Sequence, residues 1–288
     1  MKTSLKLALL LLFLGAATVS AQYDVPFVPT DMAVVDSMLA AAGVGPGDVL
    51  YDLGCGDGRI VIGAARRGVA KAVGIDINPV RIKESKANAE LAKVADEVDF
   101  REANIFESDY RDATVITMYL LTSVNLRLRP TFFETLKPGT RLVSHDFNMG
   151  DWKADREIDV VGEDGWGMHG VYFWVMPANI SGDWTFSAGD LPHVLHIGQK
   201  YQEVTGTMEV NQNKREIPGM KLTGDSIEFT VTVPRTGGAA AVYQYQGKAS
   251  GDTITGTITS GQTATPWTAR RDPKTMTTII TATGPSGY

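Results

Sequence analysis

The sequence predicts an α/β fold, in which a doubly wound, mostly parallel sheet is followed by a second domain of antiparallel strands. Strand-like and helix-like segments alternate from about residue 25 to 176, and a glycine-rich loop joins the first strand to the first helix. After residue 177 the pattern changes to short segments of period two. The length of 288 residues suits two domains, expected at residues 22–177 and 178–288.

The composition narrows the classes of function. Hydrophobic residues make up 43% and charged residues 21% of the chain, as in globular proteins with a packed core. The net charge of −6 provides no basic field, so we expect no nucleic-acid partner. The single cysteine excludes an intramolecular disulfide, and His169, His193 and His196 have no metal-ligand spacing, so we expect no metal site. The oligomeric state stays open.

Residues 1–21 have the pattern of a signal peptide. Lys2 and Lys6 precede an apolar run over residues 7–17, and small residues precede Gln22. The run is short of the roughly 20 residues that span a bilayer. We therefore expect an exported protein, periplasmic or secreted, with membrane anchoring or membrane proximity through an uncleaved segment as the alternative.

The elements of the first domain follow from apolar runs and their stop signals. A helix is expected over residues 31–42, capped by Thr30. Strands are expected at residues 49–53, 72–75, 98–101, 113–119 and 141–144, and helices at 60–67, 80–92 and 123–136, the last broken near Pro130. Residues 158–161 and 171–176 are expected as two further strands. This alternation indicates crossover connections and helices on both faces of the sheet.

The second domain shows alternating residues rich in Thr and Val. Strands are expected at residues 204–210, 226–233, 241–246 and 253–259, separated by turns of the Gly-Asp or Gly-Gly type. Successive hairpins of this kind predict an antiparallel meander, either a small lipocalin-like β-barrel or a sandwich. Inward alternation of apolar residues is compatible with a filled core and with a ligand cavity.

The most informative motif is the loop at residues 51–59, YDLGCGDGR. Its glycines stand at alternate positions: Gly54, Gly56 and Gly58. A dinucleotide fingerprint would need its third glycine where Arg59 stands. Asp52 and Asp57 would repel a pyrophosphate but suit a ligand with a positive end.

Two further strand ends extend this site. Asp76, followed by Ile77, ends the second strand, where a carboxylate can accept hydrogen bonds from ribose hydroxyls. Asn104 and Ile105 follow the third strand and can lie against an adenine ring. A glycine loop, a ribose acid and an adenine pocket on successive strands predict a nucleoside that carries a cationic group.

The order of these motifs over residues 25–176 resembles the class I S-adenosylmethionine-dependent methyltransferases, which implies a Rossmann-like fold and this cofactor. Residues 25–30, VPFVPT, ahead of the glycine loop, resemble the group containing the lysine methyltransferase of the mitochondrial ATP synthase c-subunit and its bacterial relatives. In that group the Pro-Thr segment closes over the cofactor. The expected cofactor contacts are Pro29, Thr30, Asp52, Gly54, Cys55, Gly56, Asp57, Gly58, Asp76, Ile77, Asn104 and Ile105.

The resemblance also bears on the methyl acceptor, which we expect to be a protein lysine or a small-molecule nucleophile. Residues 118–121, MYLL, lack the Asn-Pro-Pro-Tyr sequence of enzymes that methylate amide or ring nitrogens. Tyr119, after the fourth strand, is the first candidate for a catalytic residue, and Asp146, after the fifth, is the second. His145 is expected to be structural, because adjacent residues on an extended strand point to opposite sides.

A different class of function is the alternative. The chain would then be a non-catalytic envelope binding protein, with a vestigial nucleotide fold and a β-barrel for a ligand or partner. S-adenosylmethionine is made and held in the cytosol, so export leaves three answers open: an uncleaved anchor with the enzyme facing the cytosol, imported or leaked cofactor, or a fold kept for binding without turnover. The intact set of Asp52, the glycine loop and Asp76 favours the enzyme.

Overall fold

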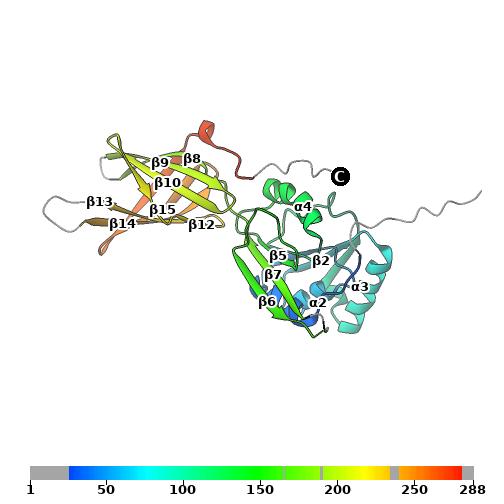
Figure 1. Cartoon of the computed structure of the whole chain (residues 1–288). Coiled ribbons are helices and arrows are strands. Elements are labelled where there is room, and N and C mark those ends of the chain that lie inside the picture. Colours follow the sequence, from blue (N-terminus) through cyan, green and yellow to red (C-terminus); the bar gives the residue numbers. More distant parts are fainter. Residues whose placement is uncertain (1–25, 164, 166, 189–190, 234–239, 281–288) are drawn as a thin grey trace, which may run out of the picture.

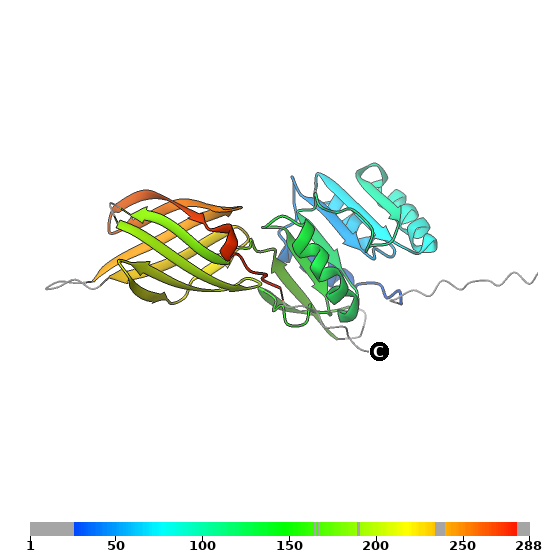
Figure 2. The same cartoon turned by 90° about the horizontal axis from the view of Figure 1, so that it is seen from above.

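The computed structural model describes residues 26–163, 165, 167–188, 191–233 and 240–280, and in them the chain forms two sheets. The predicted signal peptide lies outside these residues. Figures 1 and 2 show the two sheets in separate bodies that follow each other along the chain. Within the described residues, none of the helices is long and apolar enough to cross a membrane. The predicted order, an α/β half followed by an antiparallel β half, is confirmed.

The first sheet has seven strands in the order β3-β2-β1-β4-β5-β7-β6. Its strands are β1 (Val49–Leu53), β2 (Lys71–Asp76), β3 (Val98–Glu102), β4 (Val115–Met118), β5 (Arg141–His145), β6 (Arg156–Val161) and β7 (Met168–Val175). The first five strands are parallel, and β7 lies antiparallel between β5 and β6. The sheet is therefore mixed and mostly parallel, with β1 and β4 at its centre.

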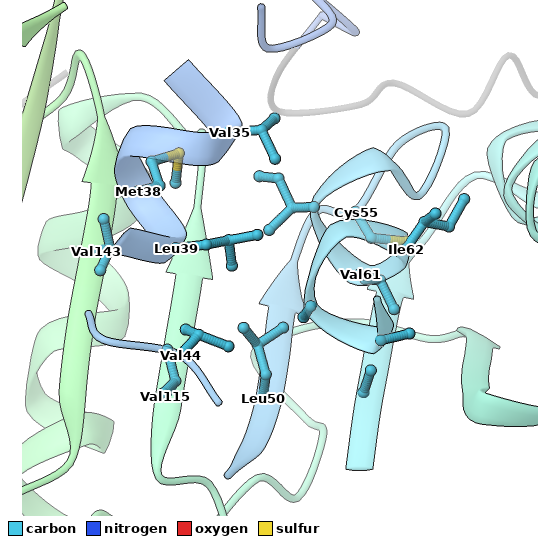
Figure 3. Packing of buried hydrophobic residues seen from close by; sticks show 14 of the residues in the cluster. Val35, Met38, Leu39, Val44, Leu50, Cys55, Val61, Ile62, Val115 and Val143 are labelled. Carbon is cyan, nitrogen blue, oxygen red and sulfur yellow. The ribbon is translucent and has the colours of Figure 1, made fainter. Parts of the chain in front are cut away.

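Helices cover both faces of this sheet. They are α1 (Met32–Ala41), α2 (Arg59–Ala65), α3 (Pro79–Ala92) and α4 (Thr122–Thr135), with a short 3₁₀ turn η1 (Ala95–Glu97) before β3. Apolar residues of α1, α2 and α3 pack on one face and those of α4 on the other. Alternate side chains of each strand point to opposite faces of the sheet. Leu50 packs with α1 and α2, whereas Tyr51 packs with α4. Figure 3 shows Met38 and Leu39 of α1 facing the strands.

Two local predictions for this half are wrong. The cap of α1 is Asp31, whose carboxylate accepts the Ala33 N–H at 2.8 Å, and not Thr30. The Thr30 hydroxyl instead lies 3.3 Å from Nδ1 of His145. Helix α4 continues through Pro130 without a break. Its buried residues Leu128 and Phe132, on either side of the proline, hold it against the sheet.

The second sheet has nine antiparallel strands in the order β11-β10-β9-β8-β16-β15-β14-β13-β12. They are β8 (Gly182–Ala188), β9 (Leu191–Lys200), β10 (Glu203–Val210), β11 (Asn213–Ile217), β12 (Lys221–Thr223), β13 (Ser226–Val233), β14 (Ala241–Ser250), β15 (Thr253–Ser260) and β16 (Thr263–Arg271), followed by the 3₁₀ turn η2 (Pro273–Thr275). The sheet curls so that β10 contacts β12, and its interior holds an aromatic cluster around Trp267. Among the described strands, β11 and β12 are its unpaired edges.

The two halves meet at the turn between β9 and β10. Tyr201 is buried and stacks on Trp152 with ring centroids 5.8 Å apart. Its hydroxyl donates to Asp151 at 2.9 Å, and the indole N–H of Trp152 donates to Gln202 at 2.7 Å. Both aromatic rings belong to the apolar cluster on the α4 face. The second half is thus anchored on the first through packing and hydrogen bonds.

Candidate functional site

A cavity of about 550 Å³ opens at the carboxyl ends of β1 to β4. Ligands of doubly wound folds bind at this edge, because the loops after the parallel strands converge there. Twelve of the residues singled out from the sequence line it: Pro29, Thr30, Asp52, Gly54, Cys55, Gly56, Asp57, Asp76, Ile77, Asn104, Ile105 and Tyr119. Gly58 and Asp146 do not.

The loop between β1 and α2 needs its glycines for two reasons. Gly54 and Gly56 have φ of 77° and 54°, in the left-handed region that residues with a side chain rarely adopt. A Cβ on Gly54 would also lie 2.8 Å from the Leu120 side chain, and one on Gly56 would lie 2.4 Å from the Phe27 ring. The backbone therefore forms the cavity wall directly. Gly58 instead caps α2 and packs against Phe100.

Three carboxylates gather around this loop. Asp52 is buried in β1 and accepts a hydrogen bond from the Thr117 hydroxyl at 2.8 Å. Burial, with a smaller contribution from Asp76 and Asp57, raises the pKa of Asp52 to about 7. Asp57 forms an ion pair with Arg59, whose Nε lies 2.9 Å from Oδ1. A cationic ligand would relieve the repulsion that Asp52 experiences.

Asp76 is held by the backbone at the end of β2. Its Oδ2 accepts the Gly56 N–H at 2.9 Å, and its Oδ1 accepts the Asn78 N–H at 2.8 Å. Each carboxylate oxygen keeps a second lone pair. The carboxylate is therefore fixed at the cavity wall and can accept hydrogen bonds from two adjacent hydroxyls, as a ribose would present.

Asn104 lines the cavity, but its side-chain amide makes hydrogen bonds to residues of its own turn. The carbonyl oxygen accepts the Phe106 N–H at 3.0 Å, and the amide nitrogen donates to Glu107 at 3.0 Å. The side chains of Ile105 and Phe106 line the same part of the wall, and the Arg127 guanidinium lies 4.0 Å from the Phe106 ring centroid. This region can bind a flat apolar group.

The segment before α1 forms the opposite wall, and the sequence indicated only part of it. Phe27 lies over Gly56, and the Arg81 guanidinium of α3 lies 4.4 Å from the centre of its ring. Arg59 donates to the Thr30 carbonyl at 2.5 Å. Phe27 belongs to the quoted VPFVPT motif, so its position could have been inferred, whereas Arg81 had no such signal.

The two candidate catalytic residues differ in position. Tyr119 follows β4 on the cavity wall, and its ring centroid is 3.8 Å from that of His145. Asp146 lies behind this ring pair, where its Oδ2 approaches His145 Nε2 at 3.2 Å and His169 Nδ1 at 3.3 Å. The prediction that His145 and Asp146 point to opposite sides is wrong, because Asp146 has a φ of 55° and leaves the extended conformation.

Cys55 lines the cavity as expected, in surroundings that disfavour its thiolate. Its side chain is buried beside Asp52 and Asp76. Burial, with smaller contributions from these two carboxylates, raises the pKa of the Cys55 thiol far above its usual range. The thiolate is the nucleophilic form of cysteine, so these surroundings disfavour a role as nucleophile. Cys55 therefore acts as a small residue that lets the loop turn.

The residues around the cavity fit S-adenosylmethionine. The fixed Asp76 carboxylate suits its ribose, and the wall at Ile105 and Phe106 suits its adenine. The acidic surroundings of Asp52 suit its positively charged end. The volume is in the range of small-molecule sites, roughly 300–1,000 Å³.

Comparisons with known proteins agree with this geometry. Residues 52–156 match the ANTKMT methyltransferase domain family. A protein-lysine N-methyltransferase from Saccharolobus islandicus is 49% identical over 153 residues, which cover 53% of this chain and 94% of that protein. The mouse adenine nucleotide translocase lysine N-methyltransferase is 30% identical over 154 residues, covering 54% of this chain and 66% of that protein.

A solved structure is also similar. The crystal structure of an RNA methyltransferase from Salinibacter ruber in complex with S-adenosyl-L-homocysteine is 54% identical, with a TM-score of 0.48. The matched region covers 51% of this chain and 93% of the Salinibacter ruber chain. The archaeal relative is matched over nearly its whole length at an identity that defines a family. This chain, whose cofactor is S-adenosylmethionine, therefore belongs to the protein-lysine methyltransferase family of S-adenosylmethionine-dependent methyltransferases.

Proposed function

We propose that this protein transfers the methyl group of S-adenosylmethionine to the ε-amine of a lysine in a protein substrate. The observation that carries the proposal is the 49% identity to the archaeal protein-lysine N-methyltransferase over 94% of that enzyme. The cavity supports it, because the acidic glycine loop and the Tyr119 wall lie on adjacent strand ends of one sheet. A methyl donor and an acceptor could thus meet there.

The chemistry makes two demands on these residues. The cofactor supplies an electrophilic methyl group on a sulfonium, and the lysine lone pair must approach it in line. Lysine must also arrive neutral, at a cost of about 5 kcal/mol at pH 7. Withdrawing the amine from water lowers this cost, because desolvation disfavours the ammonium form. In this proposal Tyr119, whose ring centroid lies 3.8 Å from that of His145, positions the amine through its hydroxyl.

The test uses the full chain, S-adenosylmethionine with an isotopically labelled methyl group, and a total protein extract. Half of the extract is first acetylated so that its lysines are blocked. We expect label in methyllysine after acid hydrolysis of the untreated extract and none in the acetylated one. Label in another amino acid, or only in a small molecule, would contradict the proposal.

The matched variant is Tyr119→Phe, which keeps the ring and removes the hydroxyl. We expect turnover to fall about tenfold or more, while the dissociation constant of S-adenosylmethionine changes less than about twofold. Unchanged turnover in Tyr119→Phe would show that the Tyr119 hydroxyl has no catalytic role. The proposal of a lysine acceptor would then rest only on where the labelled methyl group is found.

A further inference from the structure

Three potential metal ligands meet beside the cavity, although they are far apart in the sequence. His145 ends β5, Asp146 follows it, and His169 lies on the antiparallel neighbour β7. The distances are 3.0 Å between His145 Nε2 and His169 Nδ1, 3.2 Å between His145 Nε2 and Asp146 Oδ2, and 3.3 Å between His169 Nδ1 and Asp146 Oδ2. One atom of each residue thus forms a nearly equilateral triangle.

This triangle has the dimensions of one face of a metal coordination polyhedron. Nitrogen and oxygen ligands bind Zn²⁺ at about 2.0–2.2 Å, so two ligands of one ion lie about 2.8–3.6 Å apart for ligand–metal–ligand angles of about 90–110°. Hydrogen bonding explains the arrangement less well. A neutral imidazole has only one N–H. A single proton among the three atoms cannot form a hydrogen bond for each of the three short distances between them. A divalent cation attracts all three lone pairs together.

The surrounding structure holds the three atoms in place. Asp146 adopts a φ of 55°, in the left-handed region that is uncommon outside glycine. Its Oδ1 accepts the Gly170 N–H at 2.8 Å, and its own N–H donates to the Gly170 carbonyl at 2.7 Å. Oδ2 is therefore fixed toward the two imidazoles.

Both histidines are buried, and His145 has a contact on its second ring nitrogen. His145 and His169 are 1% and 6% exposed. Nδ1 of His145 lies 3.3 Å from the Thr30 hydroxyl. Histidines that bind metals commonly use their second ring nitrogen in such a contact, which fixes the tautomer and leaves the other nitrogen for the ion.

We propose that His145, Asp146 and His169 bind one divalent transition-metal ion of the Zn²⁺ class. Two imidazoles and one carboxylate are a recurrent ligand set for such ions, and three protein ligands leave a coordination position open. Thr30 and the Tyr119 ring touch His145 and also line the cavity. The ion would therefore fix one wall of the methyl-transfer site. The proposal goes beyond lysine methylation and does not depend on it.

A second histidine with nearby acids provides the control. His196 Nδ1 lies 2.7 Å from Asp183, and its Nε2 lies 3.5 Å from Glu209. The two acids thus approach opposite nitrogens of one ring, and no single ion could contact all three groups. Replacing His196 removes a histidine from an acidic environment in the other half of the chain and leaves the proposed site intact.

The test titrates Zn²⁺ into the full chain, prepared without a polyhistidine tag and stripped with a chelator. We expect one Zn²⁺ per chain, and visible d–d absorption when Co²⁺ replaces it. His169→Ala and Asp146→Asn should weaken Zn²⁺ binding about 100-fold, Thr30→Val about tenfold, and His196→Ala not at all. Circular dichroism shows whether each variant is folded.

Three results would overturn the proposal: no stoichiometric Zn²⁺ binding by the wild type, unchanged affinity in folded His169→Ala or Asp146→Asn, or loss of the site in His196→Ala. Asp146→Asn is nearly isosteric and keeps the metal test meaningful if His169→Ala does not fold. Because the titration contains neither cofactor nor methyl acceptor, its failure leaves the proposed lysine methylation standing. Failure of lysine methylation likewise leaves the metal site standing.

Discussion

The charged Asp52 carboxylate suits a cationic cofactor, but its burial makes the folded chain less stable. Its carboxylate is buried in an apolar strand, and its pKa is raised from 3.8 to about 7, first by burial. Below about pH 4 the folded and unfolded chains both carry the proton. As the pH rises to 7, the unfolded chain releases this proton and the folded chain keeps it, so stability falls. The penalty is complete above pH 7 and is on the order of 4 kcal/mol.

Asp52→Asn should therefore stabilise the protein, and more so at higher pH. The amide keeps the acceptor for the Thr117 hydroxyl and removes the ionisable group. We expect a gain of a few kcal/mol at pH 8 and almost none at pH 4, measured as the free energy of unfolding in urea. A gain of the same size at both pH values would mean that ionisation of Asp52 is not the cause.

Most of the site could be predicted at this scale, because residues at the carboxyl ends of parallel strands must converge. Asp52 and Asp76 are separated in the sequence but lie at one cavity, since β1 and β2 are adjacent and parallel. The cluster of His145, Asp146 and His169 was not predicted. It depends on the left-handed backbone of Asp146 and on the antiparallel strand β7. The spacing of residues in the sequence predicts neither feature.

At the scale of elements, the glycine loop and the segment before α1 form one unit. The Phe27 ring lies directly over Gly56, at the position where a side chain would begin. The Arg81 guanidinium of α3 also lies over this ring, 4.4 Å from its centre. The cavity wall therefore consists of backbone from one element and an aromatic ring from another, and its shape depends on their contact.

Gly56→Ala should disturb both elements at once. The new Cβ would lie 2.4 Å from the Phe27 ring and would also require alanine at a φ of 54°. We expect a loss of about 1–3 kcal/mol in unfolding free energy and a clearly weaker affinity for S-adenosylmethionine. Calorimetric titration and thermal unfolding of the same sample measure the two effects.

Gly68→Ala is the matched control for this variant. Gly68 has a φ of 72°, but a Cβ there would meet nothing within 4 Å. It should cost about 1 kcal/mol through the backbone alone and leave the cofactor affinity unchanged. Equal affinities in the two variants would show that the contact between Phe27 and Gly56 does not shape the cofactor site.

Some elements were predictable from the pattern that burial imposes on the sequence, although β8, whose burial alternates, was not among the expected strands. The range expected for β1 is the one observed, because this strand is buried on both faces and reads as an apolar run. β11 is exposed at four of its five residues, and the first part of β16 is exposed throughout, so neither shows alternation. Helix α4 was expected to break at Pro130, but packing of its buried face outweighs the lost hydrogen bond.

At the scale of the whole molecule, the two halves depend on a small anchor between them. Tyr201 at the turn after β9 packs among side chains of the first half, with Phe133 and Trp152 both 5.8 Å from its ring centroid. The Asp151 carboxylate that accepts its hydroxyl is also paired with the buried Arg129. Tyr201 thus connects the β-rich half both to α4 and to the segment after β5, beside the Trp152–Gln202 hydrogen bond.

Tyr201→Ala should uncouple the unfolding of the two halves. Removing the ring empties a buried site, at a cost of about 3–5 kcal/mol, whereas Tyr201→Phe removes only the hydrogen bond to Asp151, at about 1–3 kcal/mol. In scanning calorimetry we expect the alanine variant to unfold in two separated transitions and the phenylalanine variant to follow the wild type at a slightly lower temperature. Because Tyr201 does not line the cavity, S-adenosylmethionine should raise the midpoint of only one of the two transitions. If the alanine variant unfolds in one transition at the wild-type midpoint, the halves are held together by contacts other than Tyr201.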